Sequence, residues 1–252
     1  MLEQEAQQRL FDQFMQLFVL PEIERRKNDN LLPKNFVLKS AQVIFSGDDT
    51  KPVVRLNEEA RILASVKLKD GIKINKGDIV RQNQIEDIQI LGLPDDEEGK
   101  YAHISMAKVG DHWFLAFDFR YNKELARACF DTAKQFFDSA QEAFKQKRPA
   151  PFIDNLFSSI ELLAKAELLL IPDPKFKKKA THKGIQLKYG KYVDIGNAKP
   201  EFKATLNKLA KLRDSARYLK SDFKLSDEEG QKYLAIASDM ISYLEERIRK
   251  HT

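Results

Sequence analysis

The sequence predicts an α+β protein: an N-terminal helix and an antiparallel β-sandwich or barrel, followed by an all-α antiparallel helical bundle. Two observations predict this order. Apolar residues alternate with polar ones over much of residues 35–121, which is typical of half-buried strands. From residue 122 onward, apolar residues recur every three or four positions, which is typical of amphipathic helices. The change of period predicts two domains, residues 1–121 and residues 122–252.

The composition bounds the protein's class and location. Hydrophobic residues make up 42% of the 252 residues, which is ample for a packed core. No stretch reaches the ~18 apolar residues of a membrane span, and the N-terminus carries acids where a signal peptide carries cations. We therefore expect a cytoplasmic protein with no membrane contact. Cys129 is the single cysteine, which excludes an internal disulfide and a cysteine-based metal site.

The first half contains no pattern typical of catalysis. Residues 2–19 form an amphipathic helix that Pro21 is expected to kink or end. Six or seven short strands follow, and the acidic stretch 94–99 is expected to be a solvated turn rather than a metal site. His103 and His112 are solitary and lack the spacing of metal ligands. We expect no metal and no cofactor.

The second half predicts four long helices and a short one. The long helices cover residues 122–146, 152–171, 201–219 and a last segment that begins at Ser226. Glu229 stands three residues after Ser226, which predicts a capping box. The short helix covers 181–190. Together these helices predict an antiparallel bundle.

The charge of the chain is concentrated in this helical half. Residues 1–121 hold 17 Lys/Arg against 20 Asp/Glu, a net charge of −3, whereas residues 122–252 hold 26 against 18, a net charge of +8. Seven lysines lie in the connector 175–192, interleaved with aromatic rings. Lysines release counterions from phosphates and rings stack on bases, so the connector is a candidate nucleic-acid contact. The candidate residues are Lys177, Lys178, Lys179, His182, Lys183 and Tyr189. The alternative is a solvated loop without function.

A polar island interrupts the apolar face of the helix over 202–219. It consists of Arg213, Asp214, Arg217 and Tyr218. A cation on an apolar face is costly unless it is paired or lines a cavity. One interpretation is an internal ion pair of Asp214 with an arginine. The other is an anion site, because the planar fork of arginine suits phosphate oxygens.

Three pieces in order, SSIELLAKAELLL, THKGIQLKYGKY and FKATLNKLAKLRDSARYL, resemble a HEPN domain (higher eukaryote and prokaryote nucleotide-binding). The resemblance covers residues 122–252 and implies a helical, often dimeric bundle that binds nucleotides or RNA. Many members are metal-independent ribonucleases with an arginine followed by a histidine. Here Arg213 and Asp214 match, but Tyr218 occupies the histidine position. Tyrosine titrates near ~10 and is a poor base at neutral pH, so the family's general base is missing.

The sequence therefore supports three hypotheses. The first is a nucleotide- or RNA-binding protein without catalytic residues, which forms a homodimer through the helical bundle. The second is a metal-independent ribonuclease of the toxin or defence type, in which His182 supplies an imidazole from elsewhere in the chain. The third is a non-catalytic dimerisation scaffold. They differ in whether Arg213 and Arg217 face a ligand or are sealed by Asp214.

Overall fold

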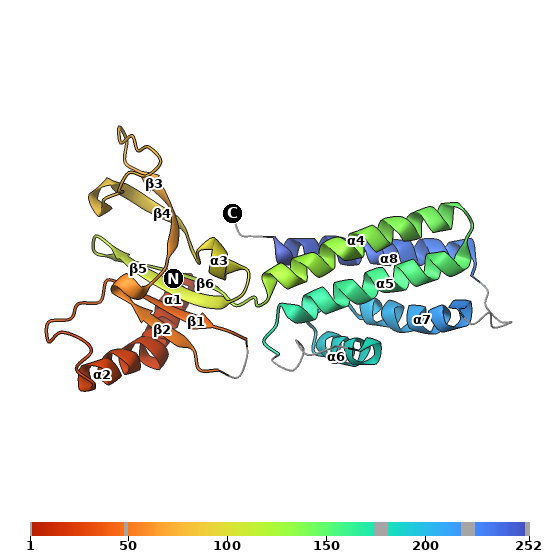
Figure 1. Ribbon diagram of the computed structural model, residues 1–252, viewed down its shortest axis with the longest axis horizontal. Coiled ribbons are helices and arrows are strands. Elements are labelled where there is room, and N and C mark those ends of the chain that lie inside the picture. Colours follow the sequence, from red (N-terminus) through yellow and green to blue (C-terminus); the bar gives the residue numbers. More distant parts are fainter. Residues whose placement is uncertain (1, 48–49, 174–180, 218–224, 250–252) are drawn as a thin grey trace. The chain divides into compact units, whose positions relative to one another are not determined.

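The computed structural model describes residues 2–47, 50–173, 181–217 and 225–249. The chain divides into two compact units, Met1–Arg120 and Tyr121–Thr252, drawn in Figure 1. The division lies next to the change of apolar period at residue 122. Each unit is described by itself below.

The N-terminal unit begins with a continuous helical segment. It consists of α1 (Leu2–Phe14), a π-helical turn (Met15–Val19) and α2 (Leu20–Asn28). The prediction that Pro21 ends the helix is wrong, since helix continues to Asn28. The backbone N–H of Leu20 donates to the carbonyl of Met15, five residues back. The hydrogen-bond register has thus already shifted where Pro21, which has no N–H, enters the first turn of α2.

The predicted antiparallel strands are present and form two sheets. The first sheet has four strands in the order β2-β1-β5-β6, and the second is the two-stranded ribbon β3-β4. The strands are β1 (Ser40–Phe45), β2 (Val53–Leu56), β3 (Leu63–Leu68), β4 (Ile85–Gly92), β5 (Ala102–Val109) and β6 (His112–Asp118). Short helical turns lie at Asn57–Glu59, Gln82–Gln84 and α3 (Asp95–Glu98).

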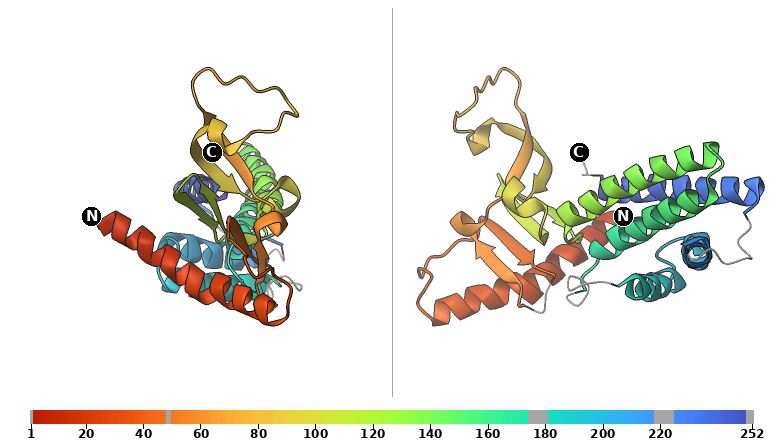
Figure 2. Two further views of the ribbon diagram at one scale, coloured as in Figure 1. Left: turned by 90° about the vertical axis from the view of Figure 1, so that its left-hand side faces the viewer. Right: turned by 45° about the vertical axis from the view of Figure 1, so that its right-hand side comes forward.

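The N-terminal helices cover one face of the four-stranded sheet (Figure 2). Helix residues Phe14, Val19 and Ile23 pack against inward-facing strand residues that include Val43 and Met106. Successive strand residues point to opposite faces, so β1 and β5 present polar side chains on the other face. Those side chains belong to Gln42, His103 and Ser105, and all three are buried.

The second unit is the predicted helical bundle. Its helices are α4 (Lys123–Lys145), α5 (Pro149–Leu169), α6 (His182–Asp194), α7 (Pro200–Arg217) and α8 (Asp227–Ile248). Helix α5 is central and packs against the other four (Figure 1). Its residues are apolar on nearly every side, and Phe152, Leu156 and Leu163 are fully buried. Pro149 and Pro151 begin this helix, because proline is tolerated in a first turn.

Within the described ranges, no helix has both the length and the apolar character needed to cross a bilayer.

Candidate functional site

The two arginines of the polar island share one carboxylate, and that carboxylate belongs to Asp154 on α5. Arg213 donates from Nε to Oδ1 of Asp154 at 2.7 Å. Arg217 donates from Nε to the same oxygen and from Nη2 to Oδ2, both at 2.9 Å. The arginines lie four residues apart, on one face of α7. One acid thus orients two guanidinium groups, and the cluster keeps a net positive charge.

The guanidinium group of Arg213 retains capacity to donate further hydrogen bonds. Arg213 lies over the ring of Phe157, with its Cζ 4.9 Å from the ring centre, and its side chain is 16% exposed. In the part of the chain that the structure describes, no acceptor contacts the Nη atoms of Arg213. The side chain of Arg217 is 50% exposed. The pair is therefore accessible to an anion at its outer side.

Asp154 is held in its charged form by the two arginines. Partial burial opposes the charge, but the hydrogen bonds from Arg217 and Arg213 outweigh it and lower the pKa of Asp154. The carboxylate therefore keeps both guanidinium groups in place over the whole neutral range. Because the arginine side chains are already held in place, less side-chain entropy is lost when an anionic ligand binds.

A second polar pair lies beside the arginines. His182 is the first residue of α6, and Thr181 caps that helix by accepting from the N–H of Gly184 at 3.1 Å. Nδ1 of His182 lies 2.6 and 2.7 Å from the two carboxylate oxygens of Glu161. An ionised carboxylate only accepts hydrogen bonds, so Nδ1 carries the proton. Nε2 of the neutral ring is then left as the basic nitrogen, and the side chain is 64% exposed.

One face of α5 brings the two pairs together. Asp154, Phe157 and Glu161 follow at i, i+3 and i+7, so they share that face. The ring of Phe157 lies 5.9 Å from the ring of His182 and 4.9 Å from the Cζ atom of Arg213. Residues from α5, α6 and α7 thus place one cation, Arg213, and an oriented imidazole, His182, against a single aromatic ring.

The interpretation of Asp214 as the internal partner of an arginine is wrong. Asp214 is exposed and makes no hydrogen bond or ion pair with any described residue. The internal ion pair exists, but its acid is Asp154, 59 residues before Arg213. Helix spacing identifies neighbours on one helix only, so it cannot identify a partner on another helix.

The prediction that Tyr189 stacks on a base is also wrong. Tyr189 is 0% exposed, and its hydroxyl donates to Oε2 of Glu167 at 2.9 Å inside the bundle. Burial, together with the charge of Glu167, raises the pKa of Tyr189. The hydroxyl is satisfied by Glu167 on α5, which is why the ring faces the core rather than solvent.

The remaining predicted site residues divide into two groups. Lys183 is exposed and follows His182 directly. Lys177, Lys178, Lys179 and Tyr218 lie outside the described residues. Of the predicted set, the structure brings together Arg213 and Arg217 through Asp154, and Arg213 and His182 through the ring of Phe157.

Three site residues were not predicted from the sequence. Asp154, Phe157 and Glu161 hold the arginines and the histidine. A signal was present, since two acids seven residues apart interrupt one face of an otherwise apolar helix. Buried carboxylates are rarely left unpaired, so such acids indicate cationic partners.

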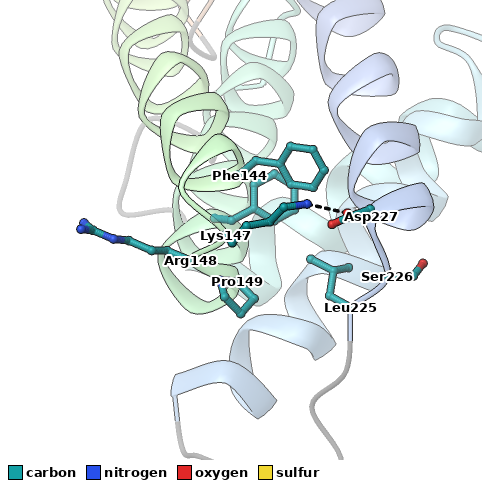
Figure 3. A pocket seen from close by; sticks show the side chains of 8 residues that line it. Phe144, Lys147, Arg148, Pro149, Leu225, Ser226 and Asp227 are labelled. Atoms are coloured by element: carbon teal, nitrogen blue, oxygen red, sulfur yellow. Dashed lines mark hydrogen bonds and ion pairs between the residues drawn. The ribbon is translucent and has the colours of Figure 1, made fainter.

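A small hollow lies at the turn between α4 and α5, in front of the start of α8 (Figure 3). Its volume is about 130 Å³, which is below the ~300 Å³ of ordinary ligand pockets. Lys147 forms an ion pair with Asp227 across it, and Ser226 already caps α8 through its contact with Glu229. Lys147 and Asp227 thus compensate each other, and the side chain of Arg148 points away from them (Figure 3).

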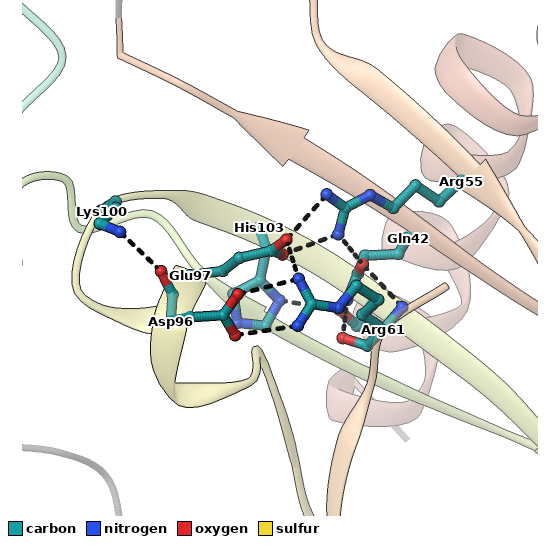
Figure 4. Close-up of polar contacts among 8 residues, drawn as sticks. Gln42, Arg55, Arg61, Asp96, Glu97, Lys100 and His103 are labelled. Atoms are coloured by element: carbon teal, nitrogen blue, oxygen red, sulfur yellow. Dashed lines mark hydrogen bonds and ion pairs between the residues drawn. The ribbon is translucent and has the colours of Figure 1, made fainter. Parts of the chain in front are cut away.

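The N-terminal unit contains a polar network that the sequence analysis did not foresee (Figure 4). Glu97 accepts two hydrogen bonds from Arg55, at 2.7 and 3.0 Å, and one from Arg61 at 2.8 Å. Arg61 also bonds both oxygens of Asp96. The hydrogen bonds from Arg55 lower the pKa of Glu97 despite its burial.

Two expectations about this half are therefore corrected. The stretch 94–99 is not simply a solvated turn, because it contains α3 and places Glu97, 8% exposed, in this network. His103 is not solitary, because its Nδ1 lies 2.9 Å from Oγ of buried Ser105, which Gln42 also contacts. The arginines and acids compensate one another, so the network fastens α3 to the sheet.

A shallow hollow of about 650 Å³ with a mixed polar and apolar lining lies between α1 and β6. Its lining includes Phe11 and Trp113, whose rings are 6.0 Å apart, together with Leu115 and Phe117. It contains no cluster of charges like that around Arg213.

No group of three or more His, Cys, Asp or Glu side chains suited to a metal ion occurs in the described ranges. Comparison of the chain with protein-family models, with curated proteins and with solved structures finds no match.

Proposed function

We propose that the helical unit binds a nucleotide or RNA, with Arg213 and Arg217 as the phosphate-binding residues. The observation that carries this proposal is the sharing of one carboxylate by two arginines. Asp154 orients both guanidinium groups, and the Nη atoms of Arg213 point past it with no acceptor among the described residues. The remaining donors of Arg213 and the exposed side of Arg217 suit the oxygens of a phosphate group.

The surroundings support a polyanionic ligand. Lys183 is exposed beside His182, and residues 122–252 carry 26 Lys/Arg against 18 Asp/Glu, a net charge of +8. A basic surface attracts phosphates through counterion release. The resemblance to HEPN domains points to the same class of ligand, and the cytoplasm, where we place the protein, supplies it.

The test is the affinity of Arg213→Ala for a fluorescent single-stranded RNA and for a labelled nucleotide, measured by fluorescence anisotropy. Loss of a charge-assisted contact to phosphate is worth about 1.5–3 kcal/mol, so we expect affinity to fall about 10- to 150-fold. Lys211→Ala is the matched control, because Lys211 is an exposed cation on the same helix. Unchanged affinity in a variant that still unfolds cooperatively rejects the site.

A second candidate function is metal-independent RNA cleavage, and the pair of His182 and Glu161 favours it. Nε2 of His182 takes the proton of a ribose 2′-hydroxyl, and that oxygen attacks the adjacent phosphorus. The P–O5′ bond breaks, and the leaving 5′-oxygen takes a proton from water. The products are a 2′,3′-cyclic phosphate and a 5′-hydroxyl, and His182 afterwards returns the 2′-hydroxyl proton to the hydroxide left in solvent. Glu161 orients the imidazole, while the arginines stabilise the charge on the phosphoryl oxygens. In this candidate, His182 takes the role that Tyr218 cannot fill.

Cleavage of labelled RNA in the presence of a chelator tests this candidate. His182→Gln keeps a polar side chain but removes the base, so we expect the cleavage rate to fall about 10²- to 10⁴-fold with RNA affinity nearly unchanged. A substrate with 2′-deoxyribose at every position must remain intact. If wild-type protein cleaves nothing, or if His182→Gln cleaves as fast as wild type, catalysis by His182 is rejected and the binding proposal stands on its own test.

A further inference from the structure

The β3–β4 ribbon of the N-terminal unit lacks a core of its own. None of its residues from 63 to 90 with a described side chain is buried. The ribbon projects from the four-stranded sheet, with the connection 69–84 at its far end (Figure 2). An isolated two-stranded ribbon is marginally stable in water, and three or more strands with an apolar face are needed for independent stability. The ribbon therefore has the properties of an element that a partner completes.

One face of the ribbon is apolar along its whole length. The register pairs Ala64 with Leu91, Val66 with Ile88 and Leu68 with Ile85. Paired residues lie on the same face, and two bulges in β4 keep the apolar residues of both strands together. Apart from Leu91 at the root, these side chains are half-buried or exposed, and none belongs to either hydrophobic core.

The outer edge of β3 is open to another strand. Its partner in the sheet is β4 alone. In the described ranges, no backbone hydrogen bond connects residues 63–68 to a segment other than β4. The strand contains no proline, and its one charge is Lys67, which pairs with Glu86 on β4. Natural edge strands are commonly protected by prolines, charges, bulges or covering loops. β3 has no proline, its Lys67 is engaged by Glu86, and the two bulges lie in β4 rather than on the open edge.

We propose that β3 pairs antiparallel with β3 of a second copy of this chain, in a register centred on Val66. In this register Ala64 faces Leu68 of the second copy, and Val66 faces its own equivalent. The two apolar faces then join into one face of four strands. On the opposite face, Lys67 faces Ser65.

Neighbouring registers fit less well. A register centred on Lys67 sets two ammonium groups directly opposite each other, which is unfavourable. A register centred on Ser65 places Leu63 opposite Lys67 and leaves fewer apolar pairs within β3. The order of apolar and polar residues in β3 thus matches its own reverse about Val66, as a contact between two identical strands about a twofold axis requires. This contact is separate from the dimer through the helical bundle that the sequence predicts.

A disulfide tests the register directly. In Val66→Cys the two Cα atoms of the paired strands lie about 4.5–5.5 Å apart, within the range of a disulfide. We expect mild oxidation to give a covalent dimer on a non-reducing gel. Leu63→Cys is the matched control, since its equivalents lie about 20 Å apart in this register. The native Cys129 is buried. Equal cross-linking of both variants, or none of Val66→Cys, overturns the proposal.

Charge pairing provides an independent test by light scattering. Val66→Lys and Val66→Glu each place like charges at the centre of the contact, so each variant alone should dissociate at least about tenfold more readily than wild type. An equimolar mixture pairs Lys with Glu and should restore the dimer. A monomeric wild type, a dimer that persists in both single variants, or a mixture that stays monomeric overturns the proposal. Persistence in both variants would instead support the contact through the bundle.

Discussion

Replacing Asp154 by asparagine separates a binding site from a structural ion pair, because the two interpretations predict different signs for binding. Asp154 accepts three hydrogen bonds from Arg213 and Arg217. In Asp154→Asn one side-chain oxygen remains, and the amide NH₂ replaces the oxygen that accepts from Nη2 of Arg217. The new NH₂ group then faces the Nη2 donor of Arg217, and the negative charge of residue 154 is lost. The side chain is 35% exposed, so we expect a stability loss of only about 1–2 kcal/mol.

Binding should change in the opposite direction. A phosphate on the outer side of the guanidinium groups lies roughly 7 Å from the carboxylate of Asp154. Two unit negative charges at that distance repel by about 0.6 kcal/mol in water and about 1.2 kcal/mol at an effective dielectric constant of ~40. Removing the carboxylate should therefore tighten RNA binding about three- to eightfold. Arg213 stays positioned by the ring of Phe157, which limits the loss of preorganisation.

The assay combines thermal unfolding with fluorescence anisotropy on single-stranded RNA at one low salt concentration. The control is Asp214→Asn, which removes the same charge from an exposed position without a partner among the described residues. It should leave stability unchanged and alter affinity less than about twofold. If Asp154→Asn lowers stability while RNA affinity stays equal to that of wild type, the arginines serve the bundle only and the proposed site is refuted.

Two further predictions concern the architecture of the helical unit. A Cβ atom at Gly230 would clash with the ring of Phe144, so Gly230→Ala should destabilise the helical unit by about 1–3 kcal/mol in chemical denaturation, although alanine favours helix. A double variant with Phe144→Leu should recover most of this lost stability. If the losses of the two single variants simply add in the double variant, the clash is contradicted. Burial raises the pKa of Glu167, against the opposing effects of Tyr189 and Arg247, so the folded state holds this proton more tightly than the unfolded chain and stability falls as pH rises above about 4.5. Glu167→Gln, which still accepts from Tyr189, should flatten this decline in unfolding free energies measured from about pH 5 to 8; an unchanged slope would assign the decline to other groups.

The sequence determines the features of this protein that depend on near neighbours along the chain. The period of the apolar residues separates the strands from the helices at residue 122, as the element order shows. The capping box of Ser226 and Glu229 begins α8 as predicted. Local spacing also identified Arg213 and Arg217 as cations on one helix face, because helix geometry alone fixes which residues lie four apart.

Tertiary structure alone decides which side chains meet across elements. Asp154, rather than Asp214, pairs with the arginines, and Glu161 orients His182, because packing sets one face of α5 against α6 and α7. The same packing turns Tyr189 toward Glu167 in the core. Such contacts join residues up to 63 positions apart, and no periodicity encodes them. They depend on which helix faces exclude water together, and that is settled only when the whole bundle assembles.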